Sequence, residues 1–152
     1  MAILLQEDNV ISLRTAFVND DGNLAYFSLM PADLESLIPK GRTWWAPKDF
    51  DWVSKDSVWL YRRMRSAADE KKLMRDFPCV DQDVKPLAFE KPPQFKLRWT
   101  DSGNSVALYL NGEPWAFIHE ESHHGYSKGI VKETIEKHVW NQALFEKTFV
   151  AQ

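Results

Sequence analysis

Residues 95–119, FKLRWTDSGNSVALYLNGEPWAFIH, are the stretch of this chain that decides its fold. Apolar and polar side chains alternate over residues 95–99 and again over 106–110, with turn-forming residues between the two runs. Asn111 and Gly112 then supply the two positive-φ positions of a tight type I′ turn. The pattern predicts a three-stranded antiparallel meander over about residues 94–119.

An N-terminal hairpin is predicted by a second pair of alternating segments. Residues 10–18 alternate apolar with polar side chains and end in Asn19-Asp20-Asp21-Gly22, after which the aromatic-rich residues 24–29 follow. Together with the meander, this hairpin indicates an antiparallel sheet.

Two helices are predicted to pack on that sheet, one central and one C-terminal. Over residues 54–77 the apolar side chains fall on one arc at about 100° per residue, and Pro78 ends the pattern. Over residues 127–149 a second apolar stripe consists of Val131, Ile135, His138, Phe145 and Phe149. Helices on an antiparallel sheet, without βαβ alternation, predict an α+β fold.

The length and composition predict one globular domain spanning residues 1–152. A chain of 152 residues with 44% apolar residues can form one core, and a Pro-rich extended connection is expected at 78–93. Cys79 is the single cysteine, no apolar run approaches membrane-spanning length, and the net charge is −3. We therefore expect a cytoplasmic protein without membrane insertion, for which nucleic acid is an unfavoured partner.

The sharpest chemical motif is His119-Glu120-Glu121-Ser122-His123, a literal match to H-E-x-x-H. On a helix this spacing places His119 and His123 on one zinc ion with Glu120 as general base, so a zinc-dependent hydrolase is one alternative function. The turn at Asn111-Gly112 argues against it, because the residues that follow are committed to a strand. His138 is a further candidate ligand for a structural or regulatory metal.

The leading interpretation is a non-enzymatic protein-binding or regulatory domain, with no catalytic residue and no cofactor assigned. Two groups of apolar residues are the candidate binding surface: Trp44, Trp45 and Trp52 in one span, and Trp140 with Leu144 on the side of the last helix opposite its core stripe. The partner would be another protein or a second copy in a homodimer. A second alternative is single-stranded nucleic-acid binding through Trp and Arg stacking.

Overall fold

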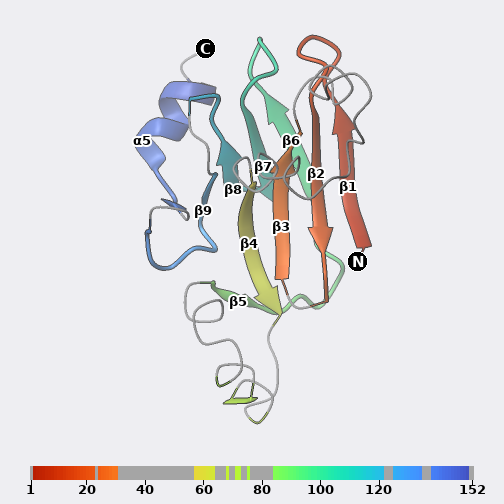
Figure 1. The fold of residues 1–152 in the computed structure, drawn as a ribbon, viewed down its shortest axis with the longest axis vertical. Coiled ribbons are helices and arrows are strands. Elements are labelled where there is room, and N and C mark those ends of the chain that lie inside the picture. The colour runs from red at the N-terminus through yellow and green to blue at the C-terminus, as the bar shows by residue number, and fades with distance from the viewer. Residues whose placement is uncertain are drawn as a thin grey trace, which may run out of the picture.

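Two five-stranded sheets form the body of the protein in the computed structural model, which describes residues 2–22, 24–30, 57–63, 68, 71–72, 75, 84–121, 125–134 and 138–150 (Figure 1). The first sheet has the order β1-β2-β3-β4-β5, formed by Ala2–Asp8, Thr15–Asp20, Leu24–Leu29, Ser57–Arg63 and Pro86–Leu87. The second has the order β10-β9-β8-β7-β6, formed by His138–Val139, Tyr126–Ser127, Glu113–Ile118, Val106–Leu110 and Phe95–Trp99.

Both sheets are mixed, with one short parallel pair at an edge of each. Strands β1 to β4 pair antiparallel and β5 joins β4 in parallel, while β6 to β9 pair antiparallel and β10 joins β9 in parallel. The described fold is therefore mostly β, and the α+β class predicted from the sequence is wrong.

One apolar core lies between the two sheets. Val18 and Phe27 from the first sheet belong to the same buried cluster as Leu108 and Ile118 from the second, and none of the four is more than 1% exposed. Side chains from strands of both sheets fill this layer, as expected for sheets packed face to face. Burial of this apolar surface is the main driving force for the β-sandwich.

The C-terminal segment covers the outer face of the second sheet. Helix α5 (Gln142–Phe145) begins at Asn141, whose side chain accepts a hydrogen bond from the Leu144 amide at 3.0 Å, and it continues as the π-helical turn η2 (Glu146–Val150). Phe145 and Phe149 from this segment pack on Phe117 of β8, with ring centroids 6.0 and 5.8 Å away. A second, aromatic core therefore lies between sheet and helix.

The predicted helix over 54–77 is wrong in its N-terminal part, which is strand β4, whereas the described residues beyond that strand, Ala68, Lys71, Lys72 and Arg75, are helical. Tyr26 of β3 pairs with Trp59, whereas Ala25 pairs with Tyr61, so Leu60 is an extra residue in β4, at a β-bulge. The bulge puts Leu60 and Tyr61 on the same face and interrupts the period-2 pattern of the strand. Consecutive buried residues then resemble a helical arc, which explains the error.

The predicted helix over 127–149 is also wrong for most of its length. Ser127 ends β9, Lys128 and Gly129 form a turn, and His138 and Val139 form β10 before the short helix begins. Val131, assigned to the buried stripe, is 56% exposed. The stripe was correct only at its end, where Phe145 and Phe149 are buried.

The meander and the N-terminal hairpin are confirmed by the strand pairing. Strands β6, β7 and β8 lie side by side, and Asn111 and Gly112 have positive φ angles of 50° and 85° at the turn between β7 and β8. Strands β2 and β3 form the hairpin, although the sequence pattern did not reveal β1 and placed residues 10–14 in a strand. These residues are a loop held by Asn9, whose Oδ1 accepts hydrogen bonds from the Ile11 and Ser12 amides at 2.9 Å.

Candidate ligand-binding groove

The register of the first sheet brings Asp20, Tyr61 and Arg63 to one end of the sandwich interior. Asp20 pairs with Ala25, and Ala25 pairs with Tyr61, so these residues form a row across three strands. Directly paired residues point to the same face, and Ala25 belongs to the core. Arg63 follows Tyr61 by two positions and therefore shares its face.

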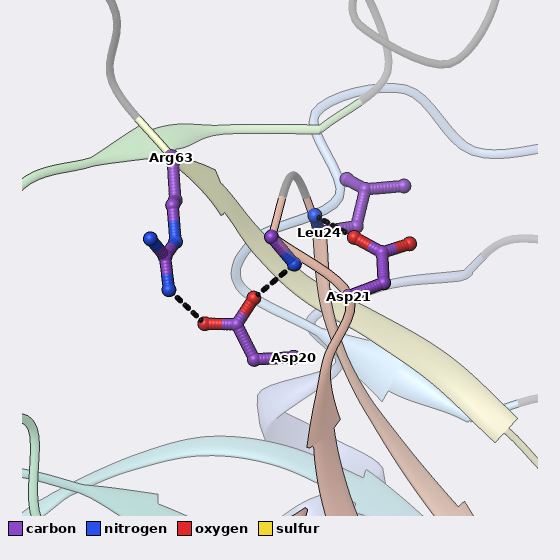
Figure 2. Close-up of polar contacts among 5 residues, drawn as sticks. Asp20, Asp21, Leu24 and Arg63 are labelled. Atoms are coloured by element: carbon purple, nitrogen blue, oxygen red, sulfur yellow. Dashed lines mark hydrogen bonds and ion pairs between the residues drawn. The ribbon is translucent and has the colours of Figure 1, made fainter. Parts of the chain in front are cut away.

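Asp20 anchors the guanidinium of Arg63. Arg63 Nη2 donates to Asp20 Oδ2 at 2.8 Å, and the Gly22 amide donates to Asp20 Oδ1 at 2.8 Å (Figure 2). The Asp20 side chain is only 9% exposed, whereas that of Arg63 is 59% exposed. Both carboxylate oxygens thus have a donor, and the guanidinium is fixed at one nitrogen while most of it faces solvent.

The β2–β3 turn that carries Asp20 is itself fixed by local hydrogen bonds. Asp21 Oδ1 accepts from the Leu24 amide at 2.8 Å, and Gly22 has a φ of +98°, which favours glycine (Figure 2). The carboxylate of Asp20 is therefore held by a turn with little freedom, and so is the guanidinium that it anchors.

A groove of about 550 Å³ lies beside this pair. Its apolar walls come from β1, β5 and the segment that follows β5: Leu4, Leu87, Phe89, Pro92 and Pro93. The ring of Phe89 packs edge-on against Tyr61, with centroids 5.1 Å apart and planes at 71°.

Residues 84–93, the described part of the predicted Pro-rich connection, form the second side of the groove. The Arg62 amide donates to Lys85 O at 3.0 Å, and the Lys85 amide donates to Gly129 O at 2.7 Å. Since Arg62 belongs to the first sheet and Gly129 follows β9 of the second, this segment is tied to both sheets. The wall formed by Phe89 therefore has a fixed base.

Tyr61 and Arg63, which both line the groove, are hydrogen-bond donors at neutral pH. Burial, reinforced by the negative charge of Asp20, raises the pKa of Tyr61 to about 12, so its hydroxyl stays protonated. The hydrogen bond to Asp20 raises the pKa of Arg63, which stays charged. A ligand in this groove therefore meets a fixed cation and a neutral hydroxyl.

The histidine motif is not helical where the structure describes it. Strand β8 ends at Ile118, His119 Nδ1 accepts a hydrogen bond from the Glu121 amide at 3.1 Å, and Glu120 lies in a turn. His123 lies outside the described residues. Within the described part of the chain, no group of three or more His, Cys, Asp or Glu side chains is arranged to hold a metal ion.

His138 lies in the short strand β10 and not on a helix. Its ring stacks on Tyr126 at 4.7 Å, and its Nδ1 lies 3.6 Å from Glu133 Oε1. The aromatic stack and the neighbouring carboxylate therefore account for the position of His138 on this edge of the second sheet.

Trp140 and Leu144 pack against their own sheet. The Trp140 ring lies 5.3 Å from Phe117 and 5.0 Å from Phe145, and the Lys128 ammonium lies 4.8 Å from its centroid. Leu144 is half-buried against the same cluster. The use of Trp140 and Leu144 as a binding surface for a partner stays a prediction. Trp44, Trp45 and Trp52 lie outside the described residues.

Sequence reasoning missed the Asp20–Arg63 pair because its members are 43 positions apart and Arg63 was assigned to a helix surface. The available signal was the polar turn Asn19-Asp20-Asp21-Gly22, which marked a hairpin without indicating a partner for its carboxylates. No protein-family model, curated protein or solved structure matches this chain. Among the described residues, no helix is both long enough and apolar enough to cross a bilayer.

Proposed function

We propose that this protein is a binding domain and that the groove beside Arg63 receives a small, largely apolar ligand. One observation carries the proposal. The nearly buried carboxylate of Asp20 forms an ion pair with the exposed guanidinium of Arg63, which lies beside an apolar groove. Removing a carboxylate from water costs free energy that an ion pair only partly offsets, so we expect the pair to serve more than stability. Positioning Arg63 for a ligand supplies one.

The size and lining of the groove support a small ligand. Its volume of about 550 Å³ falls in the usual range for sites that take small organic molecules. Its walls are mostly apolar, with polar groups gathered around Arg63, which is the common arrangement in ligand pockets. The ring of Phe89 offers an edge or a face to an aromatic ligand.

This proposal shifts the binding role away from the surfaces suggested by the sequence. A protein partner or a homodimer that uses the predicted surface of Trp44, Trp45, Trp52, Trp140 and Leu144 stays a separate, untested prediction. The lone cysteine, Cys79, and the small net charge support a cytoplasmic setting for the binding role. No observation on the described residues favours the zinc-hydrolase or nucleic-acid alternatives over the groove.

The test uses 3-phenylpropan-1-ol, an uncharged aromatic probe that fits the apolar walls. Titration into ¹⁵N-labelled protein should shift the backbone amides of Leu87, Ala88 and Phe89, with a Kd on the order of millimolar for a molecule of this size. Phe89→Ala should weaken binding several-fold, and Phe95→Ala, a half-buried phenylalanine on β6, serves as the matched control. Shifts scattered over the surface, or equal losses in the two variants, would refute the proposal.

A further inference from the structure

We infer that the ligand of this groove carries a single carboxylate beside its apolar body, and that Arg63 binds this carboxylate with the Tyr61 hydroxyl as a second donor. The inference rests on the proposed function, since it names the chemical class of ligand for the same groove.

The groove offers hydrogen-bond donors, and not acceptors, beside Arg63. Asp20 already accepts from Gly22 and Arg63, one donor on each oxygen. Tyr61 and Arg63, the other polar groups at this end of the groove, are both donors at neutral pH. A ligand group that satisfies two donors must be an acceptor, and a carboxylate with two oxygens is the simplest.

The geometry of the guanidinium supports the same ligand group. Arginine presents five N–H donors in a rigid planar fork that matches a carboxylate with two parallel hydrogen bonds. Among the described residues, Asp20 engages Arg63 at one nitrogen, Nη2. That single contact orients the guanidinium, and the Arg63 side chain, which lines the groove, is 59% exposed. The pair is therefore preorganised, so little conformational entropy is lost when a carboxylate binds.

The net charge of the groove lining favours a carboxylate monoanion over a phosphate dianion. Its lining carries Arg63 and Lys91 against Asp20 and Glu90, so the formal charges cancel. A monoanion paired directly with Arg63 leaves a small excess of negative charge, whereas a phosphate dianion would leave a larger one near Asp20. The groove thus favours a carboxylate over a phosphate.

The experiment compares three probes that share one apolar body: 3-phenylpropionate, 3-phenylpropan-1-ol and 3-phenylpropyl phosphate. By ¹⁵N chemical-shift titration at pH 7.5, the carboxylate should bind wild-type protein about 10-fold more tightly than the alcohol, the gain expected for hydrogen bonds to a charged group. The phosphate should bind no more tightly than the carboxylate. Equal affinities for carboxylate and alcohol, or a tighter phosphate, would overturn the inference.

Substitutions at Arg63, Tyr61 and Lys91 test which side chains cause the preference for the carboxylate probe. Arg63→Gln should bring carboxylate affinity to within about 2-fold of the alcohol, and Tyr61→Phe should reduce it about 3-fold. Lys91→Gln, which removes an exposed cation from the same groove, should keep most of the preference. Arg63→Gln leaves the Asp20 carboxylate without its cation and can destabilise the fold. The double variant Asp20→Asn/Arg63→Gln removes both charges, and it should show the same loss of carboxylate affinity. A preference that survives both Arg63 variants excludes Arg63 as the carboxylate ligand.

The two proposals fail separately. Loss of alcohol binding at the groove refutes the proposed function itself. Alcohol binding at Leu87–Phe89 without a gain for the carboxylate refutes only the ligand class inferred here.

Discussion

Gly129 is the position where one added methyl group should disturb the contact between the two sheets most. A Cβ on this residue would overlap the carbonyl oxygen of Leu60, which is fixed backbone and cannot turn aside. The same oxygen accepts a hydrogen bond from Trp115 Nε1 at 2.8 Å, and Gly129 O accepts one from the Lys85 amide at 2.7 Å. Gly129→Ala therefore strains one contact and loosens two hydrogen bonds that tie the sheets together.

The expected loss of stability follows from these contacts. Overpacking of a close contact costs about 1–3 kcal/mol, and loss of a buried hydrogen bond adds about 1–3 kcal/mol. Replacing glycine by alanine restores up to about 1 kcal/mol by restricting the unfolded chain. We expect Gly129→Ala to lower the free energy of unfolding by about 1–5 kcal/mol, out of the roughly 5–15 kcal/mol typical of a domain.

The assay is urea unfolding followed by tryptophan fluorescence, together with the NMR signal of the Trp115 indole N–H. Gly112→Ala is the control: its added Cβ meets no heavy atom within 4 Å, so it reports only the cost of an alanine at a φ of +85°, about 1 kcal/mol. A loss for Gly129→Ala that is no larger than that of Gly112→Ala, with an unmoved indole signal, would refute the packing argument.

Three further predictions concern pH, the N-terminal loop and the aromatic core. Because the pKa of Tyr61 is about 12 in the folded protein and about 10 when unfolded, its neutral form contributes about 2 kcal/mol of stability below pH 10 that is lost between pH 10 and 12. Tyr61→Phe should flatten this part of the pH–stability curve, and an unchanged curve would contradict the prediction. Asn9→Ala removes the acceptor that holds two amides of the loop and should cost about 1–2 kcal/mol in urea unfolding, with Val10→Ala, at the next position and 87% exposed, as control. Phe117→Ala, at a site of 0% exposure, should cost about 3–5 kcal/mol and expose the C-terminal segment to limited proteolysis; resistance equal to wild type would show that the segment docks without this ring.

The parts of the fold that were predictable depend on neighbours in sequence. The turn at Asn111-Gly112 follows from backbone preferences of the two residues, and the strands on either side of it pair antiparallel, with one bulge at Trp115. The β2–β3 hairpin is equally local. Period-2 patterns joined by a short turn therefore gave the meander and the hairpin correctly.

The parts that were missed depend on contacts between distant segments. The bulge at Leu60 breaks the alternation of β4, and only pairing with β3 makes its residues extended. The segment after β9 is shaped by Gly129 fitting under the Leu60 carbonyl, a contact that no local pattern contains. Arg63 meets Asp20 through the same register, so the candidate groove could not be deduced before the sheet was known.

The bulge at Leu60 divides β4 into a part that faces the core and a part that lines the groove. Before the bulge, inward side chains such as Val58 belong to the core between the sheets. After it, the alternation of side chains between the two faces of the sheet is shifted by one residue. Tyr61 and Arg63 therefore lie on the inward face, whereas an unbulged strand that kept Leu60 would place them on the outward face. Deletion of Leu60 would leave Trp59 and Tyr61 as neighbours opposite Tyr26 and Ala25, so Tyr61 and Arg63 would keep their face while the core between the sheets lost a buried leucine. In a family descended from this chain, loss of the residue at position 60 should therefore weaken the packing between the sheets and leave the orientation of the groove side chains unchanged.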